Sequence, residues 1–134
     1  MDYVADTHAL IWYLFAESRL GNQALTVFTD AAAGNAKIFI PAVVVAEMIM
    51  VVEKRRIPGI TMSQLEIELE LMRNSASFEF LPLFPETIIQ SRTLTAIPDI
   101  FDRLVVAEAL RLRLPLLTGD SVIHTSGLVT TIWD

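Results

Sequence analysis

Apolar residues recur along the chain at two different spacings, and the two kinds of segment alternate. Short apolar or alternating runs are typical of strands, whereas apolar residues three or four positions apart are typical of amphipathic helices. The pattern predicts strands over residues 3–6, 38–40, 78–81, 114–118 and 129–133. It predicts helices over residues 7–15, 22–33, 41–56, 63–73, 85–94 and 101–112, with a loop over 97–101.

Local signals mark the starts of several of these helices. Asp6 or Thr7 can cap the first helix, because both side chains accept a hydrogen bond from a free backbone N–H. Pro41 suits the first turn of the third helix. Ser63 and Glu66 have the spacing of a capping box at the start of the fourth.

The alternation of strands and helices also predicts the architecture. Strands separated by helical lengths imply βαβ units, and therefore an α/β fold with a parallel sheet of about five strands and helices on both faces. The chain has no internal repeat and no linker-like stretch, so we expect a single domain over residues 1–134.

Composition narrows the class of protein. Hydrophobic residues make up 53% of the 134 residues and charged residues only 19%, and the mean hydropathy is +0.50. Because charged residues usually approach about 25% in globular domains, the chain is short of solvating surface, which excludes disorder. The shortage indicates either a densely packed small core or a surface that a partner covers.

The same composition bears on the compartment. No apolar run approaches the roughly 18–20 residues that a membrane span needs, and the start Met-Asp-Tyr carries no basic segment of a secretory signal. We therefore expect no membrane association and a cytoplasmic location. The lack of cysteine fits this expectation and excludes disulfides, thiolate catalysis and thiolate zinc sites.

Charge leaves the choice of partner open. The net charge is −6, whereas nucleic-acid-binding proteins usually carry a basic footprint. Acidic residues gathered around bound cations would reverse the local field, so the net charge alone does not exclude a nucleic-acid substrate. With only His8 and His124 as histidines, we expect any metal to be held by carboxylates, which favours Mg²⁺ or Mn²⁺.

Two carboxylates fall on apolar helix faces. Glu47 has only apolar neighbours three and four positions away, and Asp102 repeats this pattern with Val105, Val106 and Ala109. An ionised carboxylate in such a place is costly unless a cation or hydrogen bonds compensate it. Helix capping is an alternative explanation for Asp102. The other helical acids are expected on exposed faces; these are Glu53, Glu66, Glu70, Glu86 and Glu108.

Two further acids follow strands. Asp6 ends the first strand and Asp120 follows the strand over 114–118. In open parallel sheets the ligand crevice lies beyond the carboxyl ends of the strands, where the strand order reverses. If these two strands are neighbours, Asp6 and Asp120 face each other there, and Glu47 and Asp102 can complete a ring. Four carboxylates cannot all stay ionised without cations, so this pattern predicts a Mg²⁺ or Mn²⁺ site.

Several polar residues near these acids are candidates for supporting roles. Asp99 is a possible fifth oxygen ligand, or a turn residue after Pro98. A hydroxyl beside the carboxylates can orient a carboxylate or bind a metal-bound water, and capping or turn hydrogen bonds are the alternative; the candidates are Thr7, Thr118 and Ser121. For His8 we weigh packing or hydrogen bonding against catalysis.

Taken together, four motifs resemble the PIN domain, and in particular the VapC-like toxin ribonucleases of bacterial and archaeal toxin–antitoxin modules. The motifs are DTHALIWYL, IPAVVVAEM, PDIFDRLVVAEAL and LPLLTGD, and the likeness runs from Asp6 to the terminal TTIWD. The resemblance implies a three-layer α/β/α fold, Mg²⁺- or Mn²⁺-dependent endonuclease activity on RNA, an antitoxin partner that fills the cleft, and a homodimer. It assigns the acidic positions of the family to Asp6, Glu47, Asp102 and Asp120, with Asp99 as an often acidic neighbour.

The chain departs from the family pattern at three places. Many relatives have Ser or Thr where this chain has Val44, and Pro between the two loop acids where it has Ile100-Phe101. Gly119 stands where Arg or another larger residue is frequent. Each departure leaves the acids in place but can alter substrate fit.

The expected chemistry is in-line attack of a metal-activated water on a phosphodiester, because no positioned nucleophile suggests a covalent route. Arg103, next to Asp102, is the best single candidate for a substrate contact, although an ion pair within the acidic cluster is an alternative. Other basic residues that could contact the substrate backbone are near helix ends, where cations are common in any case; they are Lys54, Arg55, Arg56, Arg111 and Arg113.

Two other function classes compete with this interpretation. A catalytically silent PIN-like module would act by binding a partner, and the Trp12, Tyr13 and Phe15 cluster could serve as its interface or as core. A pseudo-enzyme would be expected to have lost an acid, and this chain retains all four. A receiver-like or phosphatase domain would use Asp6 as phosphoacceptor, but the expected second acid and late lysine are missing.

Overall fold

The computed structural model describes residues 1–134 as a five-stranded parallel sheet with seven α-helices and a short 3₁₀ helix. The strands are β1 (Asp2–Ala5), β2 (Lys37–Pro41), β3 (Phe78–Leu81), β4 (Leu116–Leu117) and β5 (Thr131–Ile132). The helices are α1 (Thr7–Phe15), η1 (Glu17–Arg19), α2 (Asn22–Ala32), α3 (Ala42–Glu53), α4 (Met62–Arg73), α5 (Pro85–Ser91), α6 (Ile100–Leu112) and α7 (Ser121–Ser126).

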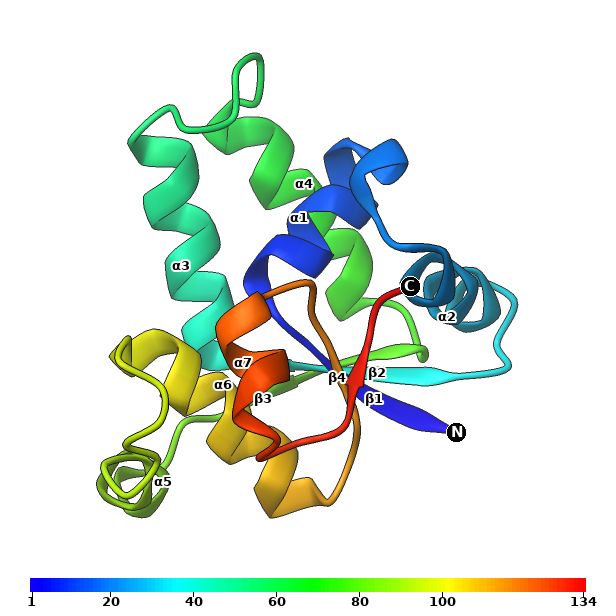
Figure 1. The fold of residues 1–134 in the computed structure, drawn as a ribbon. Coiled ribbons are helices and arrows are strands. Elements are labelled where there is room, and N and C mark those ends of the chain that lie inside the picture. The colour runs from blue at the N-terminus through cyan, green and yellow to red at the C-terminus, as the bar shows by residue number, and fades with distance from the viewer.

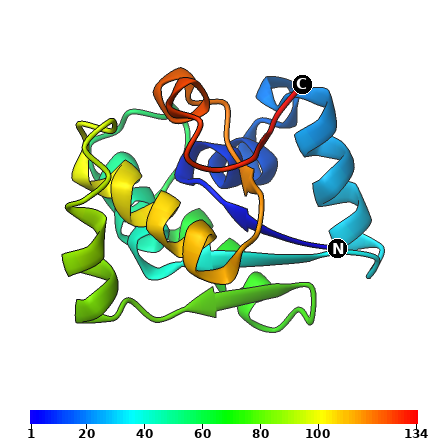
Figure 2. The same ribbon diagram turned by 60° about the horizontal axis from the view of Figure 1, so that its bottom comes forward.

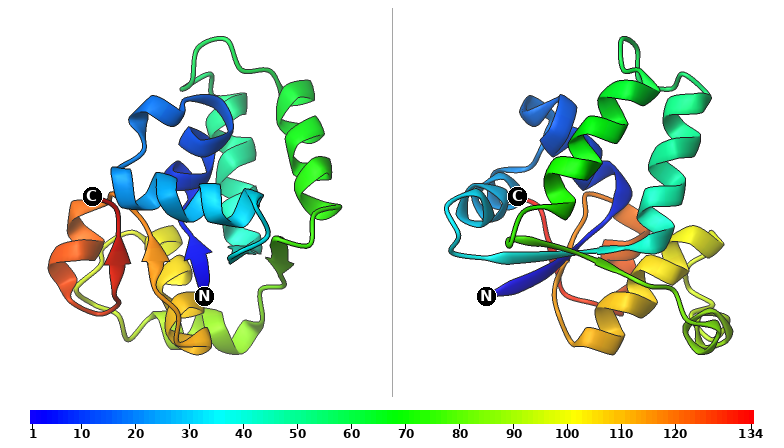
Figure 3. Two further views of the ribbon diagram at one scale, coloured as in Figure 1. Left: turned by 90° about the vertical axis from the view of Figure 1, so that its right-hand side faces the viewer. Right: turned by 180° about the vertical axis from the view of Figure 1, so that it is seen from behind.

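The helices form two layers with the sheet between them (Figure 1). Helices α1 to α4 lie over one face of the sheet, and α5, α6 and α7 lie on the other side, as the view from behind also shows (Figure 3). The predicted three-layer α/β/α architecture is confirmed. None of the helices combines the length and apolar character that crossing a bilayer requires.

The strand order β3-β2-β1-β4-β5 makes β1 the centre of the sheet. The chain first adds β2 and β3 on one side of β1, and then returns to add β4 and β5 on the other. The order therefore reverses between β1 and β4, which pair through Val4 with Leu116 and Ala5 with Leu117. This confirms that the strands carrying Asp6 and Asp120 are neighbours, and places the expected crevice at their carboxyl ends.

The core is formed by β1, β2 and β4 together with the apolar faces of the helices. Val4, Ala5, Leu116 and Leu117 are fully buried, because helices cover both faces of the central strands. The last strand brings the C-terminal segment back beside the start of α2 (Figure 2). There the backbone carbonyl of Trp133 accepts hydrogen bonds from two N–H groups in the first turn of α2.

Several predicted boundaries are wrong by a few residues. Pro41 ends β2 and precedes α3 instead of lying in its first turn, and α3 stops at Glu53 because Arg55 adopts a left-handed conformation (φ 53°). Helix α5 ends at Ser91, and β4 and β5 have two residues each instead of five. Helix α7 was not predicted, because six residues are too few for a helical period to be seen.

Two side-chain predictions are also wrong. The capping box of α4 is made by Thr61 and Gln64, so the helix begins before Ser63. Glu108 was expected on an exposed face but is only 1% exposed, and its carboxylate is 2.9 Å from Nη2 of Arg111. This ion pair compensates the burial of Glu108 within α6.

Candidate active site

A cavity of about 390 Å³ opens where the order of the strands reverses. Five acidic side chains reach it from the ends of β1 and β4, from α3 and from the start of α6, and no Lys or Arg lines it. Its lining residues are Asp6, His8, Trp12, Glu47, Asp99, Asp102, Gly119, Asp120 and Trp133. The structure thus brings together all the acids that the motifs predicted as ligands.

Asp6 lies between β1 and α1 and is held on both carboxylate oxygens. Its Oδ1 accepts a hydrogen bond of 2.8 Å from the backbone N–H of Thr7, which makes it the cap of α1, as predicted. Its Oδ2 accepts a hydrogen bond of 2.7 Å from the hydroxyl of Thr118. Burial raises the pKa of Asp6, and these two hydrogen bonds oppose that shift.

Glu47 projects from α3 toward the same cavity. The hydroxyl of Thr7 donates a hydrogen bond of 2.7 Å to Oε1 of Glu47, so Thr7 connects the start of α1 to α3. Partial burial raises the pKa of Glu47, and the negative charge of Asp6 adds to the shift, whereas the Thr7 hydrogen bond lowers it. Val44, where the resemblance implies Ser or Thr in many relatives, is buried and belongs to the hydrophobic core.

Asp99 and Asp102 have different roles at the start of α6. Asp99 is the cap, and its Oδ1 accepts hydrogen bonds from the N–H groups of Phe101 (2.7 Å) and Asp102 (3.2 Å). Capping therefore does not explain Asp102, whose carboxyl group accepts no hydrogen bond within the protein. Burial, together with the charges of the four neighbouring acids, raises the pKa of Asp102 to about 7.

Asp120 caps α7 and is tied to Asp6 through one hydroxyl. Its Oδ1 accepts a hydrogen bond of 3.0 Å from the N–H of Ile123. Its own N–H donates to the hydroxyl oxygen of Thr118 (3.1 Å), which in turn donates to Asp6. Thr118 therefore supports both carboxylates, which agrees with its predicted position beside them.

The electrostatics of the cavity are only partly balanced by the protein. Three of the acids cap α1, α6 and α7, so the N-termini of these helices face the site and favour negative charge. The raised pKa values of Asp6, Glu47 and Asp102 indicate that repulsion and burial nevertheless prevail. Carboxylate oxygens are the ligands that hard divalent cations prefer, so the donor set fits such a cation.

The carboxylates are spread around the cavity. No three His, Asp or Glu side chains are gathered closely enough to enclose a single ion in the arrangement described. Mg²⁺ usually keeps several of its water ligands and takes only one or two carboxylates directly. A cavity of about 390 Å³ has room for an ion that retains part of its hydration shell.

Comparison with known proteins identifies the family. A family model described as PIN domain matches residues 3–125. The chain belongs to the PIN domain family. The family membership expected from the four motifs is confirmed, and PIN domains are in general nucleases. No curated protein matches the chain.

Solved structures share the fold of this PIN domain. One match is a chain of VapBC2 from Rickettsia felis, in a structure bound to a DNA fragment from the VapBC2 promoter. It has a TM-score of 0.71 and 18% identity, over 100% of both chains. FitAcB from Neisseria gonorrhoeae matches with a TM-score of 0.62 and 17% identity, over 96% of this chain and 95% of that chain. FitAB bound to an IR36 DNA fragment has a TM-score of 0.62 and 13% identity, over 96% and 92%. At these identities the likeness is one of fold.

Two predicted supporting residues of the PIN domain form no hydrogen bond with the carboxylates of the cavity. Ser121 is exposed at the start of α7 and forms no hydrogen bond with the carboxylates. Arg103 does not line the cavity; its Nη2 lies 3.5 Å from the carbonyl oxygen of Pro98, and its buried Nε has no hydrogen-bond partner. A substrate contact by Arg103 stays a prediction.

The aromatic part of the cavity wall was not predicted. Trp133 follows β5, so the rule that located Asp6 and Asp120 at strand ends could also have found it. Trp133 closes over Gly119, where a Cβ atom would lie 2.6 Å from the indole Cε2. This close approach explains why the PIN domain has glycine where relatives often have a larger residue. His8 and Trp12 complete the wall from α1.

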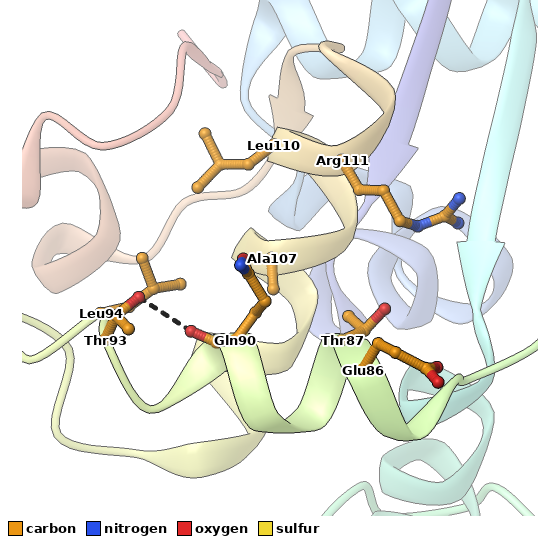
Figure 4. Close-up of a pocket in the computed structure, with 8 residues that line it drawn as sticks. All are labelled: Glu86, Thr87, Gln90, Thr93, Leu94, Ala107, Leu110 and Arg111. Carbon is orange, nitrogen blue, oxygen red and sulfur yellow. Dashed lines mark hydrogen bonds between the residues drawn. The ribbon is translucent and has the colours of Figure 1, made fainter.

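A second cavity, of about 470 Å³, lies between α5 and α6 (Figure 4). Gln90, Thr93 and Leu94 approach it from α5 and the following turn, and Ala107 and Leu110 from α6. The hydroxyl of Thr93 is already used locally, since it donates to the carbonyl oxygen of Gln90 at 2.8 Å. It contains a single acidic residue, Glu86, and therefore lacks the carboxylate cluster of the first cavity.

Proposed function

We propose that this PIN domain is a Mg²⁺- or Mn²⁺-dependent endoribonuclease that hydrolyses RNA phosphodiester bonds. The observation that carries the proposal is the convergence of Asp6, Glu47, Asp102 and Asp120 on one cavity with no Lys or Arg in its wall. Such a cluster repels a phosphodiester unless cations are bound, so its chemistry is understandable only together with a cation.

The proposed cation supplies one part of the chemistry. When bound, a divalent metal polarises a phosphodiester group and lowers the pKa of an attacking water molecule. We assign its ligands to the four acids, with Asp99 as an additional oxygen at the rim.

The chain's own residues hold the carboxylates in position. Thr118 fixes the orientation of Asp6 through a 2.7 Å hydrogen bond and accepts one from the backbone of Asp120. Thr7 fixes Glu47 in the same way. Asp102 has no such partner, and it remains free to bind a cation or, when protonated, to give a proton to a departing oxygen.

We further propose that the chain is the toxin of a type II toxin–antitoxin pair and works in the cytoplasm as a homodimer. Its motifs resemble VapC-like toxins, and its fold resembles chains of VapBC2 and FitAcB. Large exposed apolar side chains are consistent with surfaces that partners cover, among them Ile67, Leu71 and Ile89. Light scattering of the purified chain tests the dimer, and co-purification with the protein encoded next to it tests the pair.

The activity is tested by incubating purified protein with a mixture of single-stranded and structured RNA in Mg²⁺, Mn²⁺ or EDTA. We expect cleavage with either metal and none in EDTA. Asp6→Asn and Asp102→Asn should each lower the rate by at least about 100-fold, because each removes part of the several kcal/mol that a bound metal contributes.

Asp30→Asn is the matched control, because Asp30 is an exposed acid on α2 with no side-chain partner. It should cleave at the wild-type rate. Equal cleavage by wild type and the cavity variants would reveal a contaminating nuclease and contradict the proposal. Absence of cleavage in every sample, with partner binding retained, would favour the catalytically silent binding module, and cleavage of DNA alone would correct the substrate.

A further inference from the structure

Both tryptophans of the chain lie in the wall of the carboxylate cavity. Trp12 belongs to α1, and Trp133 belongs to the C-terminal segment, so the two rings come from opposite ends of the sequence. Both are partly exposed. Large half-exposed aromatic rings beside a charged site call for an explanation beyond core packing.

The position of Trp133 is fixed by its backbone and by two glycines. Its carbonyl oxygen accepts hydrogen bonds from the N–H groups of Gln23 (3.0 Å) and Ala24 (3.1 Å), which caps α2. A Cβ atom on Gly21 would lie 2.2 Å from that carbonyl oxygen, and one on Gly119 would lie 2.6 Å from the ring. The chain thus has no side chain at either place, and the ring is held beside the backbone that leads to Asp120.

The two rings differ in what already covers them. The guanidinium group of Arg19 lies 3.8 Å from the centre of a Trp12 ring, and His8 is tilted against it at 5.7 Å. No aromatic ring or cationic group of the chain stacks on Trp133. Trp133 is therefore the ring with stacking capacity left for a ligand.

We propose that Trp133 is a specificity-determining residue that stacks on an unpaired nucleobase next to the phosphodiester in the carboxylate cavity. This inference rests on the proposed function, and it narrows the substrate to single-stranded or looped RNA. Bases in such segments can be splayed out and stacked on aromatic side chains, whereas bases within a duplex cannot.

Charge gives an independent reason for an aromatic contact. With a net charge of −6 and no Lys or Arg in the cavity wall, the chain gains little from neutralising phosphates there. Stacking does not depend on charge, so it can supply affinity where the electrostatic contribution is unfavourable. We therefore expect RNA binding that depends less on salt than is usual for nucleic-acid-binding proteins.

The test measures fluorescence, which reports on stacking separately from cleavage. In a Trp12→Phe, Asp102→Asn double variant of the full chain, Trp133 is the remaining tryptophan and cleavage is suppressed. Mixed-sequence single-stranded pentaribonucleotides with Mg²⁺ should quench its emission. The same oligonucleotides with abasic riboses, and a perfectly paired RNA duplex, should not.

Matched substitutions separate stacking from a structural role. In the Asp102→Asn background that retains Trp12, Trp133→Leu should weaken pentaribonucleotide binding by about 5- to 150-fold, whereas Trp133→Phe should largely preserve it because a ring remains. Affinity is measured there by anisotropy of a labelled oligonucleotide. Both variants keep the carbonyl group that caps α2, and circular dichroism checks their folding.

Three outcomes would overturn the inference. Quenching by abasic and intact RNA to the same extent would show that no base is stacked, and equal affinities of the Leu and Phe variants would show that the ring is not needed. If the wild type cleaves RNA and Trp133→Leu cleaves it with the same kcat/KM, the stacking role is rejected, whereas the proposed nuclease function is retained. Quenching by single-stranded RNA without metal-dependent cleavage would reject the nuclease and retain the binding residue.

Discussion

The hydroxyl of Thr118 donates a 2.7 Å hydrogen bond to the buried carboxylate of Asp6, across the point where β1 and β4 lie side by side. The two residues are far apart in the sequence, and the same hydroxyl accepts the N–H of Asp120. One small side chain therefore joins the two strand-end acids that define the cavity.

Removing this hydroxyl should disturb both stability and activity. Thr118→Val keeps the shape of the side chain but leaves an oxygen of Asp6 unpaired, which should lower the free energy of unfolding by about 1–3 kcal/mol. Thr118→Ser retains the hydroxyl and should fall closer to wild type in both urea unfolding and RNA cleavage. Equal effects of Val and Ser would show that the methyl group matters more than the hydrogen bond.

The raised pKa of Asp102 predicts how the stability of the metal-free protein depends on pH. The folded pKa of about 7 lies above the ordinary value of 3.8, so the folded state binds a proton more tightly than the unfolded state. The stabilisation that protonated Asp102 gives to the folded state is fully present below about pH 4 and is lost as the pH rises through 7. In EDTA, the Tm should therefore fall between pH 5 and pH 8 more steeply for wild type than for Asp102→Asn.

Addition of Mg²⁺ provides the complementary measurement. Protons compete with the cation for the carboxylates, so Mg²⁺ should raise the Tm of the wild type more at pH 8 than at pH 5. If the Tm of the wild type and the Tm of Asp102→Asn change with pH in parallel in EDTA, the pKa of Asp102 is not raised.

The acids could be predicted from the sequence because two simple rules apply to them. Asp6 and Asp120 follow buried strands, and the carboxyl ends of adjacent parallel strands open on one crevice. Glu47 and Asp102 interrupt apolar helix faces, where an uncompensated charge is costly. Both rules start from periodicity, which the sequence displays directly; the pairing of β1 with β4, on which the first rule also depends, was assumed there and is shown by the structure.

Other features depend on contacts that periodicity does not encode. Trp133 reaches the cavity because Gly21 and Gly119 leave space for it, and neither glycine carries a signal of this in the sequence. The capping box of α4 uses Thr61 and Gln64 although Ser63 and Glu66 have the same spacing, since the residue at which a helix begins depends on the preceding loop. Burial of Glu108 was missed even though Leu104, Val105 and Leu112 flank it at helical spacing.

The contact between Gly119 and Trp133 predicts a strong coupling between these positions. In Gly119→Ala the new methyl group would lie 2.6 Å from Cε2 of Trp133, so the ring must move, at a cost of about 1–3 kcal/mol of unfolding free energy. The same substitution in a Trp133→Leu background should cost clearly less. A double-mutant cycle by urea unfolding measures this coupling, and additive effects would show that the ring does not rest against Gly119.

The ion pair between Glu108 and Arg111 predicts an asymmetry between single and double substitutions. Glu108 is 1% exposed at its side chain and Arg111 is 39% exposed, so Arg111→Ala leaves a buried carboxylate without its partner. Because water can reach the site once Arg111 is removed, we expect a loss of about 1–3 kcal/mol, below the value for a fully buried pair. The double variant Glu108→Leu, Arg111→Leu should be closer to wild type, because both charges are removed and the apolar surroundings of Glu108 accept leucine. Urea unfolding of the wild type, Arg111→Ala and the double variant measures these differences. A double variant less stable than Arg111→Ala would show that the pair itself stabilises α6.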